Sequence, residues 1–108
     1  MSAPLDLSSD RSGEQTVLRV SGEVDYTNVG RFAEALAGSQ ADAGAVVLDL
    51  RGVEFLDSMG LGAILEALLR AQERGKKLAI MCGPAVERVL EAAGLRDRVP
   101  IERLNGGA

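Results

Sequence analysis

The chain has 108 residues, of which 46% are hydrophobic, so it can form one small domain with a core of ordinary size. A net charge of −4 without a basic patch excludes the usual nucleic-acid binder, and no apolar run approaches the roughly 18 residues of a membrane span. The chain has no histidine and a single cysteine, Cys82, which excludes a Ser-His-Asp triad, metal sites built on histidine or thiolates, and an intrachain disulfide. These exclusions argue against an enzyme.

The N-terminal part of the chain predicts a β-hairpin. Apolar and polar residues alternate at 5–8, which indicates a short edge strand, and a cluster of turn-forming residues follows at 11–14. A second alternation at 16–20 predicts the partner strand. Gly22 then permits a sharp bend or a bulge.

A helix is predicted after this hairpin. Its apolar residues have helical spacing, and Asp25, Thr27 or Asn28 can cap its start. The segment 38–44 is small and polar and therefore predicts a loop. The apolar stripe of this helix consists of Val29, Phe32, Ala33 and Leu36.

The run at 46–50 is apolar on both faces, which is typical of a central strand in a parallel sheet, and Arg51-Gly52 is predicted to end it. An amphipathic helix is predicted next, with Ser58 as its N-cap residue and Gly75 just beyond its end. Its inward stripe is predicted to consist of Leu61, Ile64, Leu65, Leu68 and Leu69.

The C-terminal third predicts a strand at 77–81, a helix that Pro84 opens and Gly94 closes, and a last short strand at 99–101. Helices that alternate with strands imply right-handed crossovers. The predicted fold is therefore α/β: a small mixed, mostly parallel sheet of four to five strands with three helices, in which the first strand is antiparallel to its neighbour. The absence of repeats and linkers predicts one domain over residues 1–108. The lone cysteine and the lack of a signal-like N-terminus predict a cytoplasmic protein, and we expect it to hold no cofactor.

Ser58 lies where free backbone N–H groups and the helix dipole favour an anion, including a phosphate carried on the serine itself. Such a phosphate adds about −1.5 to −2 charge at pH 7, beside Asp57 and near Asp25, and the helix terminus tolerates it without unfolding. A partner that offers carboxylates or a close apolar contact would then be repelled. From spacing alone, Ser58 can equally be an N-cap and nothing more, and Asp25 a cap of the first helix.

Four short motifs follow one another along the chain: Gly22-Glu23-Val24-Asp25, Val47-Leu48-Asp49-Leu50, the longer stretch from Val53 to Leu61 around Asp57-Ser58-Met59-Gly60, and Ala92-Ala93-Gly94-Leu95. Together they resemble the STAS domain family, and within it the stand-alone bacterial anti-sigma factor antagonists, over about residues 4–103. Family members continue past the last strand into a C-terminal helix, which here is expected to be absent or very short. One flank of the sheet is then bare or covered by another subunit. A weak homo-oligomer is therefore one of the expected states of the chain.

The resemblance implies a partner switch. The unphosphorylated protein binds an anti-sigma factor that is itself a serine kinase, and this binding frees the sigma factor. Phosphorylation ends the binding, and a phosphatase restores it. The alternative is a STAS scaffold subunit of a stress-sensing assembly or of a lipid-transport ATPase. Carried over residue by residue, Ser58 is the phosphoacceptor, Asp25 and Asp57 are the acidic neighbours, and Met59, Gly60 and Gly62 belong to the partner-binding surface.

Three other interpretations concern single features of the site. Gly60 and Gly62 either open the backbone to a kinase or allow close packing on the sheet. Asp25 and Asp57 lack a companion base or a cation site, which argues against acid–base catalysis. Gly60-Leu61-Gly62 lacks the third glycine of a dinucleotide-binding loop. Elsewhere, Cys82 is predicted to be a small buried hydrophobe rather than a redox sensor.

Overall fold

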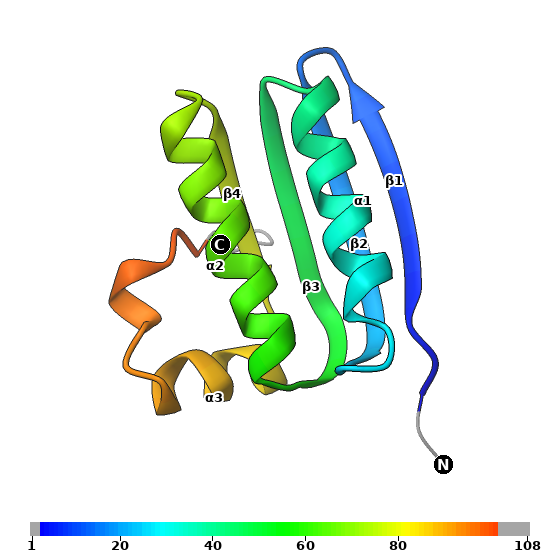
Figure 1. The fold of residues 1–108 in the computed structure, drawn as a ribbon, viewed down its shortest axis with the longest axis vertical. Helices are drawn as coiled ribbons and strands as arrows, with labels where there is room; N and C mark the ends of the chain where they lie inside the picture. The colour runs from blue at the N-terminus through cyan, green and yellow to red at the C-terminus, as the bar shows by residue number, and fades with distance from the viewer. Residues whose placement is uncertain (1–2, 102–108) are drawn as a thin grey trace, which may run out of the picture.

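The computed structural model describes residues 3–101, which form a four-stranded sheet with two helices on one of its faces (Figure 1). The strand order is β1-β2-β3-β4, with β1 antiparallel to β2 and the other neighbours parallel. This arrangement confirms the predicted mixed, mostly parallel α/β fold with three helices. The elements are β1 (Asp6–Ser12), β2 (Gln15–Val24), α1 (Val29–Asp42), β3 (Ala45–Leu56), α2 (Ser58–Glu73), β4 (Lys77–Cys82), α3 (Pro84–Ala92) and a 3-10 turn (Arg96–Arg98).

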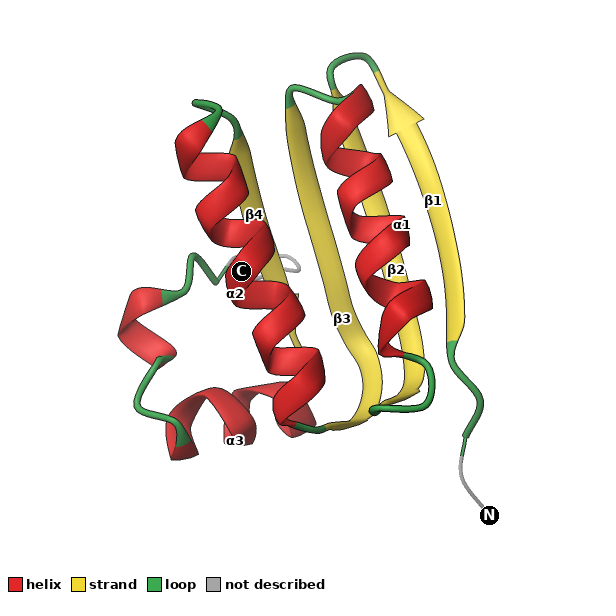
Figure 2. Ribbon diagram, viewed as in Figure 1, coloured by secondary structure: helices red, strands yellow, loops and turns green. Residues whose placement is uncertain are grey.

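The helices α1 and α2 lie side by side over the sheet, whereas α3 lies across the end at which the parallel strands finish (Figure 2). The core forms where these helices meet the strands. No helix in the described range is long and apolar enough to cross a membrane. The largest fully buried side chains are those of Val20, Val24, Phe32, Leu36, Leu48, Leu50, Ile64, Ile80, Val86 and Leu90.

The predicted hairpin is confirmed, and two glycines give it its shape. Gly13 has φ 62° and turns β1 into β2, with Ser12 paired to Gln15 across this two-residue turn. Gly22 has φ 89°, and a Cβ at this position would lie 2.0 Å from the carbonyl oxygen of Pro4. The register between β2 and β3 shifts directly after Gly22, but the extra residue is Glu54 of β3, so the bulge lies on the partner strand and Gly22 itself provides the close approach to Pro4.

β3 is longer than predicted, because the expected end at Arg51-Gly52 is wrong and the strand runs to Leu56. A register shift lets Gly52 pair with Ser21, and a Cβ on Gly52 would lie 2.9 Å from that of Ser21. The glycine therefore marks a close approach of two strands rather than a strand end. The extension brings β3 to the same end of the sheet as β2, where Leu56 pairs with Val24.

The loop predicted at 38–44 is wrong, since α1 continues to Asp42. The side chain of Gln40 is buried against α2, where its Nε2 donates to the carbonyl oxygen of Ala67 at 2.8 Å and its Oε1 accepts from Nε of Arg70 at 2.9 Å. Both polar ends of the buried amide are thus bonded. A local composition of small and polar residues cannot reveal partners that another helix supplies.

α2 faces the core with smaller residues than predicted. Ile64 is buried as expected, but Leu69 is 60% exposed, so its predicted inward position is wrong. Ala67 and Ala71 are buried instead, on the helix that packs beside α1. The stop at Gly75 is confirmed, because this glycine has φ 64° directly after the C-cap residue.

The C-terminal part follows the prediction with one exception. α3 begins at Pro84, and Gly94 closes it with φ 71°. The last strand predicted at 99–101 is reduced to a single parallel bridge between Ile101 and Ile80. The predicted lack of a C-terminal helix concerns residues 102–108, which lie outside the described residues.

Candidate functional site

The predicted site lies at the end of the sheet where β2 and β3 finish and α2 begins (Figure 1). The last residues of these strands, Val24 and Leu56, pair with each other. Just beyond them, the N–H of Asp57 donates to the carbonyl oxygen of Val24 at 3.1 Å. This bond holds the start of α2 against the loop of residues 25–28.

Asp57, not Ser58, is the N-cap of α2, so the predicted capping role of Ser58 is wrong. Asp57 has extended backbone geometry, and its Oδ1 accepts from the N–H groups of Met59 and Gly60, both at 3.0 Å. Ser58 is the first helical residue and is exposed. The hydroxyl of Ser58 therefore does not cap the helix. The carboxylate of Asp57 already binds the N–H groups of Met59 and Gly60, which could otherwise have held a phosphate.

The second oxygen of Asp57 reaches across to another part of the chain. Its Oδ2 accepts from the N–H of Tyr26 at 3.0 Å. One carboxylate thus binds three backbone N–H groups, two at the start of α2 and one in the loop after β2. These bonds fix the position of Tyr26 relative to Ser58.

Asp25 is held within its own loop. Its Oδ1 accepts from the hydroxyl and the N–H of Thr27, and these bonds lower the pKa of the Asp25 carboxyl below its ordinary value, the hydroxyl most. Asn28 is the N-cap residue of α1, but its side chain accepts from the N–H of Asp25 at 3.0 Å instead of bonding to the helix. The predicted side-chain cap of α1 is therefore wrong, and these residues shape the loop beside Asp57.

The two glycines of the site differ. A Cβ on Gly60 would lie 2.4 Å from Cδ1 of Leu56 and 3.0 Å from Cγ1 of Val24, so this glycine lets α2 pack closely on the strand ends. A Cβ on Gly62 would meet no atom within 4 Å. Close packing accounts for Gly60, whereas Gly62 leaves open space on the helix.

Three large apolar side chains of the segments that meet at Asp57 are exposed. Tyr26 is 76% exposed, Met59 is 55% exposed and Phe55 is 49% exposed. We call Tyr26, Ser58 and Met59 the Ser58 surface, because Ser58 and Met59 follow Asp57 in the chain and Tyr26 bonds to it. Phe55 instead lies beside α3, in a hollow that Arg88 and Val89 also line. The sequence analysis missed Tyr26 and Phe55. Their signal was that two of only three aromatic residues flank the predicted site.

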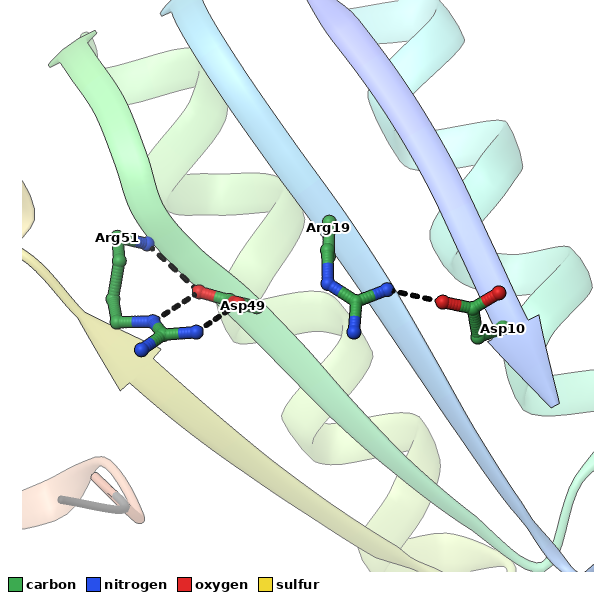
Figure 3. A network of polar contacts seen from close by, with 4 residues as sticks. All are labelled: Asp10, Arg19, Asp49 and Arg51. Carbon is green, nitrogen blue, oxygen red and sulfur yellow. Dashed lines mark hydrogen bonds and ion pairs between the residues drawn. The ribbon is translucent and has the colours of Figure 1, made fainter. Parts of the chain in front are cut away.

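Asp49 belongs to a motif of the sequence but lies away from this surface. Its carboxylate is 6% exposed and accepts from Nε and Nη2 of Arg51, at 2.9 and 2.8 Å, and from the N–H of the same residue. The bonded guanidinium lowers the pKa of Asp49. Figure 3 shows this pair on β3 beside the exposed ion pair of Asp10 and Arg19.

Cys82 does not offer a reactive thiol. It is half-buried, and this burial, with a smaller contribution from the charge of Glu87, raises the pKa of the thiol to about 11. A thiol of such high pKa is hardly ionised at neutral pH and is a weak nucleophile. Cys82 therefore acts as a small, mainly apolar side chain at the end of β4.

Residues 7–104 match the STAS domain. The chain belongs to the STAS domain family. A curated relative, the anti-sigma F factor antagonist of Paenibacillus polymyxa, is 32% identical over 88 residues, which are 79% of this chain and 75% of the relative. The solved structure of an anti-sigma factor antagonist from Mycobacterium paratuberculosis has a TM-score of 0.82 and 29% identity, covering 94% of this chain and 89% of that one.

A more distant neighbour shares the fold alone. This is SpoIIAA of Bacillus, an anti-sigma factor antagonist solved in an unphosphorylated and a phosphorylated form. The TM-scores are 0.75 and 0.71 at 18% identity, over 94% of this chain and 88% and 91% of the two neighbour chains.

Proposed function

We propose that this chain is an anti-sigma factor antagonist whose Ser58 surface binds an anti-sigma factor and thereby frees a sigma factor. The anti-sigma factor is a serine kinase, its phosphorylation of Ser58 ends the complex, and a phosphatase restores it. The observation that carries this proposal is the position of Ser58: it is exposed, Asp57 caps α2 in its place, and two exposed apolar residues lie next to this cap, Met59 in the helix and Tyr26 through its N–H bond to Asp57.

The exposed side chains supply the binding energy in this proposal. Aromatic residues and methionine are enriched in the centres of protein interfaces, where they bury large apolar areas. The backbone of Tyr26 is held in place by the bond from its N–H to Asp57, so the loop itself does not have to be ordered when a partner covers the side chain. An anti-sigma factor with an apolar contact surface fits this arrangement.

In this proposal the phosphate acts through its negative charge and does not change the fold. It adds about −1.5 to −2 charge at pH 7 directly beside the exposed Met59, where a bound partner would have to remove its water. The Asp57 carboxylate already binds the N–H groups of Met59 and Gly60, so these donors are not free to neutralise it. The complex is therefore expected to break while the fold stays intact.

Two relatives support the antagonist role: the anti-sigma F factor antagonist of Paenibacillus polymyxa and the anti-sigma-B factor antagonist of Listeria monocytogenes each align over three quarters or more of their own length. The names of these relatives fit a regulatory, non-catalytic role for this chain. The fold neighbour SpoIIAA occurs in a phosphorylated form, which supports the switch by analogy. The kinase and the phosphatase rest on the family resemblance.

Intact-mass measurement after incubation with candidate serine-kinase anti-sigma factors of the same organism and ATP tests the proposal. We expect one phosphate adduct, its loss in Ser58→Ala, and its retention in the matched control Ser12→Ala, an exposed serine on β1. A stable complex without any adduct would favour the scaffold-subunit alternative and contradict the switch.

A further inference from the structure

The outer face of α2 carries apolar positions in line with Ser58. Gly62, Leu65 and Leu69 follow the serine at intervals of four, three and four residues, so all four positions lie on one face of the helix. Leu69 is 60% exposed and Leu65 is partly exposed, so no element within residues 3–101 fully covers this face of α2 (Figure 2). We call Gly62, Leu65 and Leu69 the α2 stripe.

Gly62 has no packing role inside the domain. A glycine within a helix destabilises it relative to alanine, and a Cβ at this position would meet no atom within 4 Å. Close packing explains Gly60 but not Gly62. The missing side chain instead leaves the backbone of α2 open between Ser58 and Leu65, where a partner can approach more closely than it could over a side chain.

The α2 stripe is continuous with the Ser58 surface. Within residues 3–101 the exposed large apolar residues are Tyr26, Phe55, Met59 and Leu69, and the first three belong to the segments that meet at Asp57. Leu69 lies eleven residues beyond Ser58, about 16 Å along the helix, yet on the same face as the serine. The stripe therefore extends the Ser58 surface along α2 and does not form a separate patch.

The stripe also determines what kind of segment can cover it. Beyond the first turn the backbone N–H groups of α2 bond within the helix, and the side chains of the stripe are apolar, so a partner backbone finds no donor or acceptor there. A strand or loop laid on this face would bury unpaired N–H and C=O groups, whereas an α-helix bonds its own. A partner helix of about three turns matches the length of the stripe.

Charge beside the stripe indicates the character of that helix. Glu66 and Glu73 are exposed on α2 next to the stripe, and neither forms an ion pair within residues 3–101. Arg70, which lies between them on the helix, donates from its Nε to Gln40 of α1. Basic side chains at one edge of the partner helix would complement these two carboxylates.

We propose that the anti-sigma factor covers the α2 stripe with an amphipathic α-helix that approaches closely at Gly62, buries Leu65 and Leu69, and carries a basic edge. This inference rests on the proposed function, because it names the segment of that partner which lies over Ser58. Glu66 and Glu73 lie beyond Gly62, so the basic edge is placed away from Ser58, where the proposed function requires an apolar contact.

Affinities of the anti-sigma factor for full-chain variants test the stripe. Gly62→Leu should bind at least about 10-fold more weakly and Leu69→Gln at least about 5-fold more weakly, with circular dichroism and melting temperature near or above those of the parent. Gly38→Leu is the matched control and should bind like the parent, because Gly38 is an exposed glycine with equal open space on the β1 side of α1.

Ser58→Asp belongs to the same series, so that the two proposals can fail separately. If the Gly62 and Leu69 variants bind like the parent while Ser58→Asp binds weakly, the helix contact is overturned and the proposed function stands. If both stripe variants bind weakly while Ser58→Asp binds like the parent, the stripe contact stands and the switch fails.

Charge reversal and cross-linking test the occupant. Glu66→Lys and Glu73→Lys should each weaken binding by roughly 2- to 10-fold at low salt and by less at high salt, whereas Asp6→Lys, with the same charge change on β1, should not. Equal effects in all three variants overturn the basic edge. A photoreactive amino acid in place of Leu69 should label partner residues three or four apart, and labels at alternate residues overturn the helix.

Discussion

Asp49 and Asp57 are two carboxylates of the β3 region that each accept three hydrogen bonds. Asp49 lies within the strand and receives all three from Arg51, two residues further along the chain. Asp57 lies directly after the strand and receives two from the start of α2 and one from Tyr26 in the loop after β2. The number of bonds is the same, but the segments that they join are not.

This difference separates a local contact from a coupling contact. The pair of Asp49 and Arg51 stabilises one stretch of β3. It joins no other segment, so its loss should not move the rest of the molecule. Asp57 joins the loop after β2 to α2, so it positions the exposed residues around Ser58 as well as the helix start. Its removal should therefore affect both stability and partner binding, whereas removal of Asp49 should affect stability alone.

Asp57→Ala should give the largest loss. We expect the free energy of unfolding to fall by about 2 to 3 kcal/mol, the sum of a lost N-cap and a lost hydrogen bond to Tyr26, with weaker partner binding. Urea unfolding measures the first and a binding titration the second. Asp57→Asn separates the two contributions, because its single amide oxygen can still cap α2 whereas its Nδ2 cannot accept from the N–H of Tyr26. We expect this variant to keep the cap and to lose only the bond to Tyr26. A loss below about 0.5 kcal/mol in the alanine variant would show that Asp57 does not hold these segments together.

Gly60→Ala should come next, with a loss of about 1 to 3 kcal/mol, because the added methyl group would overlap Leu56. Gly62→Ala, two residues along the same helix, has open space and should instead gain about 0.5 to 1 kcal/mol. Melting curves of both variants test whether α2 sits as close to the strand ends as the Asp57 bonds require. Equal changes in the two variants would contradict this packing.

Asp49→Asn should lose about 1 kcal/mol at neutral pH and leave partner binding unchanged. The Arg51 guanidinium holds the pKa of the Asp49 carboxyl below its ordinary value of 3.8, so the unfolded chain takes up this proton first as the pH falls. The contribution of Asp49 to stability is therefore complete above about pH 5 and is lost as the pH falls through 3.8 and below.

Urea unfolding from pH 7 to pH 3 measures this dependence. The parent should lose more stability over the acid range than Asp49→Asn does. Asp10→Asn is the control, since its ion pair with Arg19 is exposed and should contribute no more than about 0.5 kcal/mol. A parent and an Asp49→Asn variant with the same acid slope would contradict the assigned role of Arg51.

Hydrophobic periodicity was enough to predict the sheet and the three helices, and residue type was enough to predict the turn glycines, because those features follow from local sequence. The errors arose where a distant segment decides the outcome. Gln40 stays helical because α2 bonds both ends of its amide, and β3 continues past Gly52 because Ser21 packs against it. Leu69 is exposed because alanines occupy the inner face of α2.

The position of the site was predictable, but its arrangement was not. Asp57 and Ser58 are adjacent and both are good N-cap residues, so spacing alone cannot decide which one caps α2. The strand length settles it, since β3 ends at Leu56 and places Asp57 in the extended conformation of a cap.

The affinity of the anti-sigma factor for Ser58→Asp and Ser58→Asn, two variants of nearly equal size that differ in charge, tests most directly whether charge at Ser58 controls binding. We expect Ser58→Asp to bind at least about 10-fold more weakly than Ser58→Asn, a difference of about 1.4 kcal/mol, with both variants folded like the parent by circular dichroism. Equal affinities for the two variants would contradict a switch that works through charge.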